Sequence, residues 1–251
     1  SSGSVENHIS GVKYIHGHTN DIQSLIQFTP DIVFHLGEYS RVEQSFKDID
    51  LVWQSNKEGT FAVIQFCMKQ NCRLIYAGSS TKFGDSGSGR SQSPYAWAKA
   101  SNTELVVNYG NWFGLDYAVV YFYNVYGGRE ISTGRYATLI ALFVKKHRNN
   151  EALTIVEPGT QLRNFTHIDD IVSGLMLVGE RGYGDNFGIG SPDAYSILEI
   201  AKMFGSNIEM IPPRKGNRSG ASVVSEKTKA LGWFNSKSVV DYINKIREEH
   251  E

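Results

Sequence analysis

The residues with the clearest potential for chemistry are Tyr95 and Lys99, which stand four positions apart in the segment Tyr-Ala-Trp-Ala-Lys. Two residues at this spacing lie on the same face of a helix. A free phenol ionises at about pH 10, and a neighbouring ammonium favours the ionised form, so such a pair can act as a base at lower pH. Ser79, in a small-residue loop upstream, offers a hydroxyl that could share the proton path. Together these groups are suited to moving a proton on or off a sugar or alcohol oxygen while a cofactor takes the hydride.

Composition excludes several other kinds of function. The chain has 251 residues, of which 41% are hydrophobic and 20% charged, so it can form one large α/β domain with or without a smaller lobe. The net charge of −1 gives no basic surface for nucleic acid or for an anionic membrane. No apolar run approaches the roughly 18 residues that span a bilayer, and no signal peptide opens the sequence. We therefore expect a cytoplasmic protein that binds neither nucleic acid nor membrane.

The cysteines and histidines indicate neither disulfides nor a metal site. The spacing of Cys67 and Cys72 fits neither a disulfide framework nor a zinc motif, so we expect reduced thiols. The seven histidines are scattered and form no His-Glu-x-x-His motif. A catalytic metal is therefore not expected.

Short apolar runs alternate with amphipathic stretches, as in a parallel sheet with helical crossovers. Strands are predicted over 31–36, 73–77 and 117–122, and helices over 51–69, 94–112, 135–148, 168–180, 197–204 and 238–249. The segment Gly188-Ile-Gly190 is predicted to be a turn. Ligands of such sheets gather at the carboxyl ends of the strands, where His35, Ser79 and Asn124 fall.

Further short motifs follow one another along the chain, each weak alone. They are Asp31–Leu36, Asn56–Thr60 (Asn-Lys-Glu-Gly-Thr), Leu74–Gly84, Phe122–Gly127, Arg163–Asp170 (Arg-Asn-Phe-Thr-His-Ile-Asp-Asp), and Arg214–Asn217 followed by Leu231–Trp233. With Tyr95 and Lys99 they stand in an order that resembles the extended short-chain dehydrogenase/reductase family. The resemblance runs from about Gly3 to Trp233 and is closest to the nucleotide-sugar epimerase/dehydratase branch, of the UDP-glucose 4-epimerase kind.

The resemblance implies an α/β protein with a Rossmann-type doubly wound parallel sheet and a smaller mixed α/β substrate-binding lobe. Residues 1–130 and 160–190 would form the NAD-binding part, and 131–159 and 191–251 the nucleotide-sugar-binding lobe. The family's first strand, glycine-rich turn and helix hold the cofactor pyrophosphate. This sequence begins at Ser1-Ser2-Gly3-Ser4, near the end of the following stretch. We therefore expect about 30 residues of a βαβ unit to be missing from it.

The resemblance also implies roles for individual residues. Ser79, Tyr95 and Lys99 would be catalytic. NAD would contact His35, Leu36, Gly37, Asn56, Ala77, Tyr95, Lys99 and Tyr121. The nucleotide-diphosphate sugar would contact Ser79, Ser80, Asn124, Arg163, Arg214 and Ala221.

Each of these roles has a structural alternative. Ser79 could be an ordinary turn residue, Lys99 a solvated lysine, Asn124 a turn cap, and Arg163 and Arg214 surface ion-pair partners. His167 is expected to pack or cap near Asp169 rather than to catalyse.

The loop after the first predicted strand departs from the family pattern. The family usually has two alanines where this chain has Gly37 and Glu38. We expect the Glu38 carboxylate either to face solvent or to pair with Arg41 on the same loop.

The reaction implied by these residues is epimerisation at C4 of the sugar. Dehydratases of the branch carry a carboxylate just after the catalytic hydroxyl, whereas Ser80 and Thr81 follow Ser79 here. The alternatives are a dehydratase or reductase with NAD or NADP, and a non-catalytic protein that binds a dinucleotide or nucleotide sugar. An ungapped count of seven from Arg214 reaches Ala221, where galactose-specific epimerases have a bulky Tyr. The small residue mildly favours an N-acetylhexosamine substrate.

Family members commonly form homodimers through a four-helix bundle, built here from the helices at 51–69 and 94–112. The candidate contacts are Phe61, Phe66 and Val107, although these side chains could equally face the sheet.

Overall fold

The computed structural model describes residues 4–80, 89–213, 223 and 225–250. Its centre is a four-stranded parallel sheet in the order β1-β2-β3-β8. The strands are β1 (Ile32–His35), β2 (Arg73–Ala77), β3 (Tyr117–Phe122) and β8 (Gly184–Ile189). The sheet and its helical crossovers are the Rossmann-type α/β fold that the sequence predicts.

The prediction of a turn at Gly188 was wrong, because this residue lies within β8 and pairs with Tyr121 of β3. The β8 sequence begins with Gly-Asp-Asn, residues with low strand propensity, so its local signal is weak. Pairing with the buried strand β3 overrides that signal.

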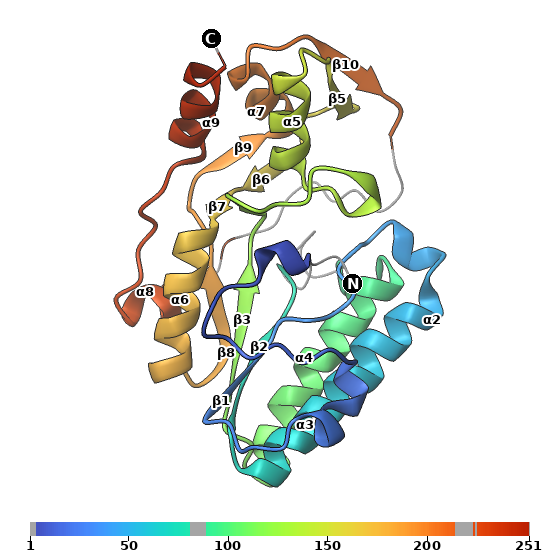
Figure 1. Ribbon diagram of the computed structural model, residues 1–251, viewed down its shortest axis with the longest axis vertical. Helices are drawn as coiled ribbons and strands as arrows, with labels where there is room; N and C mark the ends of the chain where they lie inside the picture. The colour runs from blue at the N-terminus through green and yellow to red at the C-terminus, as the bar shows by residue number, and fades with distance from the viewer. Residues whose placement is uncertain (1–3, 81–88, 214–222, 224, 251) are drawn as a thin grey trace.

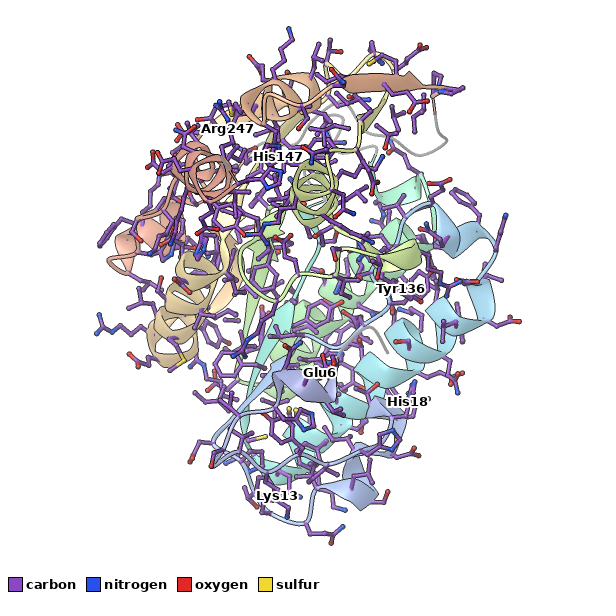
Figure 2. All side chains as sticks on the ribbon, turned by 45° about the horizontal axis from the view of Figure 1, so that its top comes forward. Glu6, Lys13, His18, Tyr136, His147 and Arg247 are labelled. Carbon is purple, nitrogen blue, oxygen red and sulfur yellow. The ribbon has the colours of Figure 1, made fainter. Side chains whose placement is uncertain are left out.

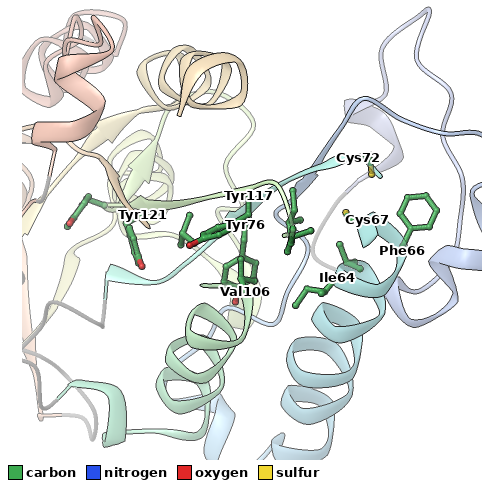
Figure 3. Close-up of a cluster of buried hydrophobic side chains, with 13 residues drawn as sticks. Ile64, Phe66, Cys67, Cys72, Tyr76, Val106, Tyr117 and Tyr121 are labelled. Atoms are coloured by element: carbon green, nitrogen blue, oxygen red, sulfur yellow. The ribbon is translucent and has the colours of Figure 1, made fainter. Parts of the chain in front are cut away.

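Helices cover both faces of this sheet (Figure 1). On one face lie α3 (Gly59–Gln70) and α4 (Pro94–Phe113), and on the other α6 (Ile168–Arg181). Figure 3 shows the core on the α3/α4 side, where Ile64 and Phe66 pack with Tyr76 and Tyr117. The opposite core contains residues of α6 and, from the C-terminal part of the chain, Trp233.

Local sequence fixes the ends of α4. Ser93 accepts a hydrogen bond from the Ala96 amide at 3.1 Å, and Pro94 occupies the first turn, where no amide donor is needed. Gly114 ends the helix with φ of 73°, a left-handed conformation that glycine adopts without a steric penalty. Tyr95 is therefore held in the first turn of a long helix that starts at the carboxyl edge of the sheet.

The segment predicted as one helix over 51–69 has three parts. A short helix α2 (Ile49–Val52) leads into a π-helical segment η4 (Trp53–Glu58), and α3 follows. The helix predicted to start at Arg135 begins instead as α5 (Leu139–Arg148), after a 3₁₀ turn η7 (Gly134–Tyr136). Shorter elements are α1 (Ile22–Leu25), α8 (Glu226–Ala230), η1 (Val5–Asn7), η2 (Thr19–Asp21) and η3 (Gln44–Phe46).

A second group of elements lies beyond the carboxyl ends of the sheet strands (Figure 1). It contains α5, α7 (Ile197–Met203) and α9 (Val239–Glu248), packed around a separate hydrophobic cluster. Its strands form pairs, namely β5 (Leu153–Val156) with β10 (Ile208–Ile211), and β6 (Leu162–Asn164) with β9 (Ala194–Ser196). A third pair, β4 (Val125–Tyr126) with β7 (Thr166–His167), adjoins them.

Arginine contacts join the two groups. Arg135 pairs with Asp48 at 3.0 Å, and Arg41 donates to the carbonyl oxygen of Tyr136 and stacks on its ring. Figure 2 shows Tyr136 at this junction, well away from His147 and Arg247. Among the described residues, no helix is both long and apolar enough to cross a membrane.

Candidate active site

A cavity of about 810 Å³ lies between the two groups of elements. One wall comes from the carboxyl edge of the sheet and the start of α4, and contributes Ser79, Ser80, Tyr95 and Asn124. The other wall comes from β5, β6 and their neighbours and contributes Thr154, Ile155, Val156, Gln161, Arg163 and Phe165. The cavity therefore opens where ligands of parallel α/β sheets bind.

Tyr95, Ser79 and Lys99 come together at the sheet-edge wall. The Tyr95 hydroxyl donates to Ser79 Oγ at 3.2 Å. Lys99, one helical turn further along α4, is buried, donates to the carbonyl oxygen of Ala77 at the end of β2, and lies 4.6 Å from the Tyr76 ring centroid. The Tyr95 phenol, hydrogen-bonded to the Ser79 hydroxyl and with the Lys99 ammonium on the same helix face, can exchange a proton with a ligand in the cavity.

The expectation for Glu38 was wrong. Its carboxylate neither faces solvent nor pairs with Arg41, but forms a buried ion pair with Lys99. Three further donors contact Glu38 Oε1, namely Thr60 Oγ1 at 2.9 Å, Asn102 Nδ2 at 3.1 Å and Tyr76 Oη at 3.2 Å. These donors satisfy the carboxylate inside the protein, which is what makes its burial tolerable.

His35 extends this buried network at the end of β1. It is 4% exposed, and its Nε2 lies 3.0 Å from Thr60 Oγ1. Burial lowers the pKa of His35 to about 4, with Lys99 lowering it further and Glu38 opposing the shift. His35 is therefore neutral at pH 7 and adds no charge beside the ion pair.

Two residues predicted to touch NAD, Asn56 and Tyr121, form hydrogen bonds within the protein, and their contact with NAD stays a prediction. Asn56 is fully buried and forms two hydrogen bonds with the backbone of Tyr39. Its Oδ1 accepts from the Tyr39 amide at 2.7 Å and its Nδ2 donates to the Tyr39 carbonyl oxygen at 3.0 Å, which braces the loop after β1. Tyr121 is fully buried in the core shown in Figure 3 and donates to Asp185 Oδ1 at 2.5 Å. Neither side chain is among the residues that line the cavity.

Leu36 and Gly37 are exposed at the end of β1, with Leu36 47% accessible. A Cβ added at Gly37 would meet no atom within 4 Å. The loop thus presents an apolar side chain and bare backbone to open space beside the Glu38–Lys99 pair. Such a surface leaves room for a flat ring system.

Asn124 and Arg163 both line the cavity, Asn124 from the sheet-edge wall and Arg163 from the opposite wall. Asn124 has φ of 30° and donates from Nδ2 to the Asn164 carbonyl at 3.0 Å, so it stabilises the turn between β3 and β4 as well as lining the cavity. Arg163 Nη1 contacts the carbonyl oxygen of Leu162 at 2.7 Å. Arg214, Ala221 and Thr81 lie outside the described residues. His167 caps α6 by accepting from the Asp169 amide at 3.2 Å, as predicted.

Sequence reasoning missed the polar residues behind Tyr95. Thr60 and Asn102 are fully buried and contact Glu38 and each other. A signal existed for Asn102, because it follows Lys99 by three positions and so shares its helix face. No comparable signal marks the pairing of Glu38 with Lys99, which lie far apart in sequence.

A family model described as "NAD dependent epimerase/dehydratase family" matches residues 3–190. The chain belongs to this family. NAD is the cofactor that the family's description names, and the open loop at Leu36 and Gly37 beside Lys99 fits a dinucleotide's ring.

Individual relatives catalyse different reactions. The chain is 28% identical to the dTDP-D-glucose 4,6-dehydratase of Dictyostelium discoideum over 68% of its own length and 44% of that protein. It is also 28% identical to a UDP-N-acetyl-alpha-D-glucosaminuronate decarboxylase of Bacillus cytotoxicus, over 68% of the chain and 57% of that protein. The chain thus matches about half the length of these two curated relatives.

A solved structure supports the fold. The UDP-glucose 4-epimerase of Thermotoga maritima, crystallised with UDP-glucose, superposes with a TM-score of 0.88 at 24% identity. The superposition covers 99% of this chain and 87% of that one. The family membership establishes the NAD-dependent epimerase/dehydratase type, and the relatives differ in the reaction that follows.

Proposed function

We propose that the protein inverts C4 of a nucleotide-diphosphate sugar through a transient 4-keto sugar. The observation that carries the proposal is the Tyr95 hydroxyl, which contacts Ser79 Oγ in the cavity wall with Lys99 one helical turn away. This arrangement provides a base, the Tyr95 phenolate, for the 4-hydroxyl proton and a cation that stabilises this phenolate before it takes the proton.

In the proposed reaction, the Tyr95 phenolate takes the proton of the 4-hydroxyl, either directly or through Ser79, and becomes a neutral phenol. When bound, NAD supplies the acceptor for the C4 hydride. Lys99 would hold the cofactor ribose and would stabilise the Tyr95 phenolate. After the keto sugar has turned, its C4 receives the hydride on the opposite face and Tyr95 returns the proton, so that no atoms or electrons are gained or lost.

The remaining contacts are proposed to hold the nucleotide diphosphate. Arg163 lines the cavity opposite Tyr95, and a guanidinium suits a diphosphate because its forked donors match the phosphate oxygens. Ser80 and Asn124 would contact the sugar end. The proposed substrates are UDP-glucose and UDP-galactose or their N-acetylhexosamine equivalents, bound by a lobe formed from 131–159 and 191–251.

A dehydratase or reductase is the alternative enzyme. The residue directly after Ser79 is Ser80, a hydroxyl that cannot replace the carboxylate needed to eliminate water. This difference supports epimerisation over 4,6-dehydration.

The experiment that tests the proposal incubates the full-length protein with NAD and UDP-, GDP- and CDP-sugars and identifies products by NMR. We expect a C4-inverted sugar without net NADH, lost in Tyr95→Phe and retained in the exposed-tyrosine control Tyr183→Phe. A keto-deoxy product would contradict the proposal and show that the protein is a dehydratase. Tight NAD binding without turnover would favour a non-catalytic binding protein.

We also propose a cytoplasmic homodimer. The free, buried thiols of Cys67 and Cys72 suit a reducing compartment. Of the predicted dimer contacts, Phe66 is buried in the core and Val107 packs against it, which leaves Phe61 exposed.

Aromatic residues on η4 and α4 add to that exposed surface. Trp53 and Trp97 are 51% and 42% exposed, and their rings stack at 6.1 Å. We expect Trp53→Ser/Trp97→Ser to halve the mass measured by light scattering, whereas Phe234→Ser, an exposed site elsewhere, leaves it unchanged. A monomeric wild type would refute the dimer.

A further inference from the structure

Glu38 departs from the alanine pair of the family, and its buried side chain accepts hydrogen bonds from Lys99, Thr60, Tyr76 and Asn102. Its side chain is only 4% exposed, and that of its partner Lys99 only 6%. Besides Lys99, three neutral donors from β2, α3 and α4 contact this carboxylate. Such complete satisfaction indicates a built arrangement rather than an incidental contact.

Apart from Glu38, the contacts of the buried Lys99 are neutral. Its other contacts are the neutral carbonyl oxygen of Ala77 and the Tyr76 ring. Within the described part of the chain, Glu38 is the one carboxylate that contacts Lys99. A buried ammonium that loses such a partner tends to release its proton, because desolvation favours the neutral amine.

The other titratable groups nearby cannot replace Glu38. His35 is neutral at pH 7, and burial keeps the pKa of the Tyr76 hydroxyl well above its ordinary value. Lys57, which donates to Ser101 and Asn102 from the neighbouring segment η4, brings a second positive charge towards the pair. Tyr95 carries a negative charge only in its phenolate form, before it accepts a proton, and therefore supplies no permanent counter-charge for Lys99.

We propose that Glu38 is a positioning residue that keeps Lys99 charged and anchored at the end of β2, within reach of Tyr95. The alanine of the family cannot supply this charge. The inference deepens the proposed function and rests on it only for the activity measurements.

The first test compares the pH dependence of kcat/KM in the wild type, Glu38→Gln and Glu38→Asp. In Glu38→Gln we expect Lys99 to lose its charge and no longer to favour the Tyr95 phenolate. The acid limb of the profile of kcat/KM against pH should therefore move to higher pH. A move of one pH unit lowers kcat/KM below that limb about tenfold. Glu38→Asp keeps the charge and should restore most of the activity, whereas Glu104→Gln, which removes a carboxylate from the exposed pair with Arg90, should have no effect.

A second test needs no turnover. The ¹⁵Nζ signal of Lys99, assigned with Lys99→Arg, should be that of an ammonium at pH 7 in the wild type and of an amine in Glu38→Gln. Glu38→Ala, which restores the family's small residue, serves if Glu38→Gln fails to fold. An ammonium signal in these variants, or an acid limb that stays in place or moves to lower pH, would overturn the proposal. If no sugar is turned over, the NMR signal still decides the role of Glu38.

Discussion

The two walls of the cavity are built differently. The sheet-edge wall places Tyr95 and Lys99 on a long capped helix and backs them with a buried network around Glu38. The opposite wall comes from short paired strands, and its long polar side chain Arg163 contacts the backbone of its own neighbour. In the proposed reaction, the hydrogen bonds that fix Tyr95 and Lys99 are concentrated on the wall where the proton would move, and the opposite wall would hold the substrate.

The largest expected effect is on the free energy of unfolding, which should respond differently to substitutions on the two walls. Lys99→Met should lower the free energy of unfolding by about 3–5 kcal/mol, because it leaves Glu38 as an unpaired buried charge. The matched change on the opposite wall, Arg163→Met, should stay within about 0.5 kcal/mol. Guanidinium unfolding followed by circular dichroism measures both, and the double variant Lys99→Met/Glu38→Gln should recover most of the loss. Equal losses for the two single variants would contradict the comparison.

The next effect concerns pH and is specific to the sheet-edge wall. Burial lowers the pKa of His35 from 6.5 to about 4. Between these pH values the imidazole is protonated in the unfolded chain and neutral in the folded protein. The stability from His35 is therefore complete above pH 6.5 and is lost as the pH falls towards 4. Between pH 6.5 and 5 the loss should be about 2 kcal/mol.

The measurement for His35 is the free energy of unfolding at these two pH values in the wild type and His35→Gln. The variant should lose about 2 kcal/mol less than the wild type. His16→Gln, an exposed site, should behave as the wild type does. An identical pH dependence for His35→Gln and the wild type would show that His35 is not buried as described.

The smallest effect separates the walls by kinetics. Ser79→Ala should lower kcat about 10- to 100-fold with little change in KM, because the proton path is weakened after the substrate has bound. Arg163→Gln should raise KM about tenfold at nearly constant kcat, because a charged contact to the substrate is lost in both ground and transition states. Steady-state kinetics with the substrate identified by NMR measures both changes. A lower kcat in Arg163→Gln and a higher KM in Ser79→Ala would mean that the opposite wall takes part in the chemistry.

The fold was largely readable from the sequence. The predicted strands at 73–77 and 117–122 have the bounds that the structure shows, because continuous apolar runs mark buried parallel strands. The strand β8 and the break at η4 were not readable, since pairing with β3 and local packing, rather than residue propensity, determine them.

The site was readable only in part. That Tyr95 and Ser79 come together could be predicted because they belong to short motifs, and their catalytic role stays a prediction. The partner of Glu38 could not be found, because its contact with Lys99 depends on how β1 and α4 pack and no local pattern encodes it. For the same reason the sequence did not predict that Asn56 braces the loop after β1 or that Tyr121 packs in the core.

The central claim is that the hydride leaves C4 and returns to C4 of the same sugar. The most direct measurement uses a nucleotide sugar carrying deuterium at C4 and follows the label in the product by NMR. We predict an inverted product that keeps the deuterium at C4 and gains none at C5 when the reaction is run in D₂O. Deuterium transferred to C6, or solvent deuterium at C5, would contradict the account and show that the site eliminates water.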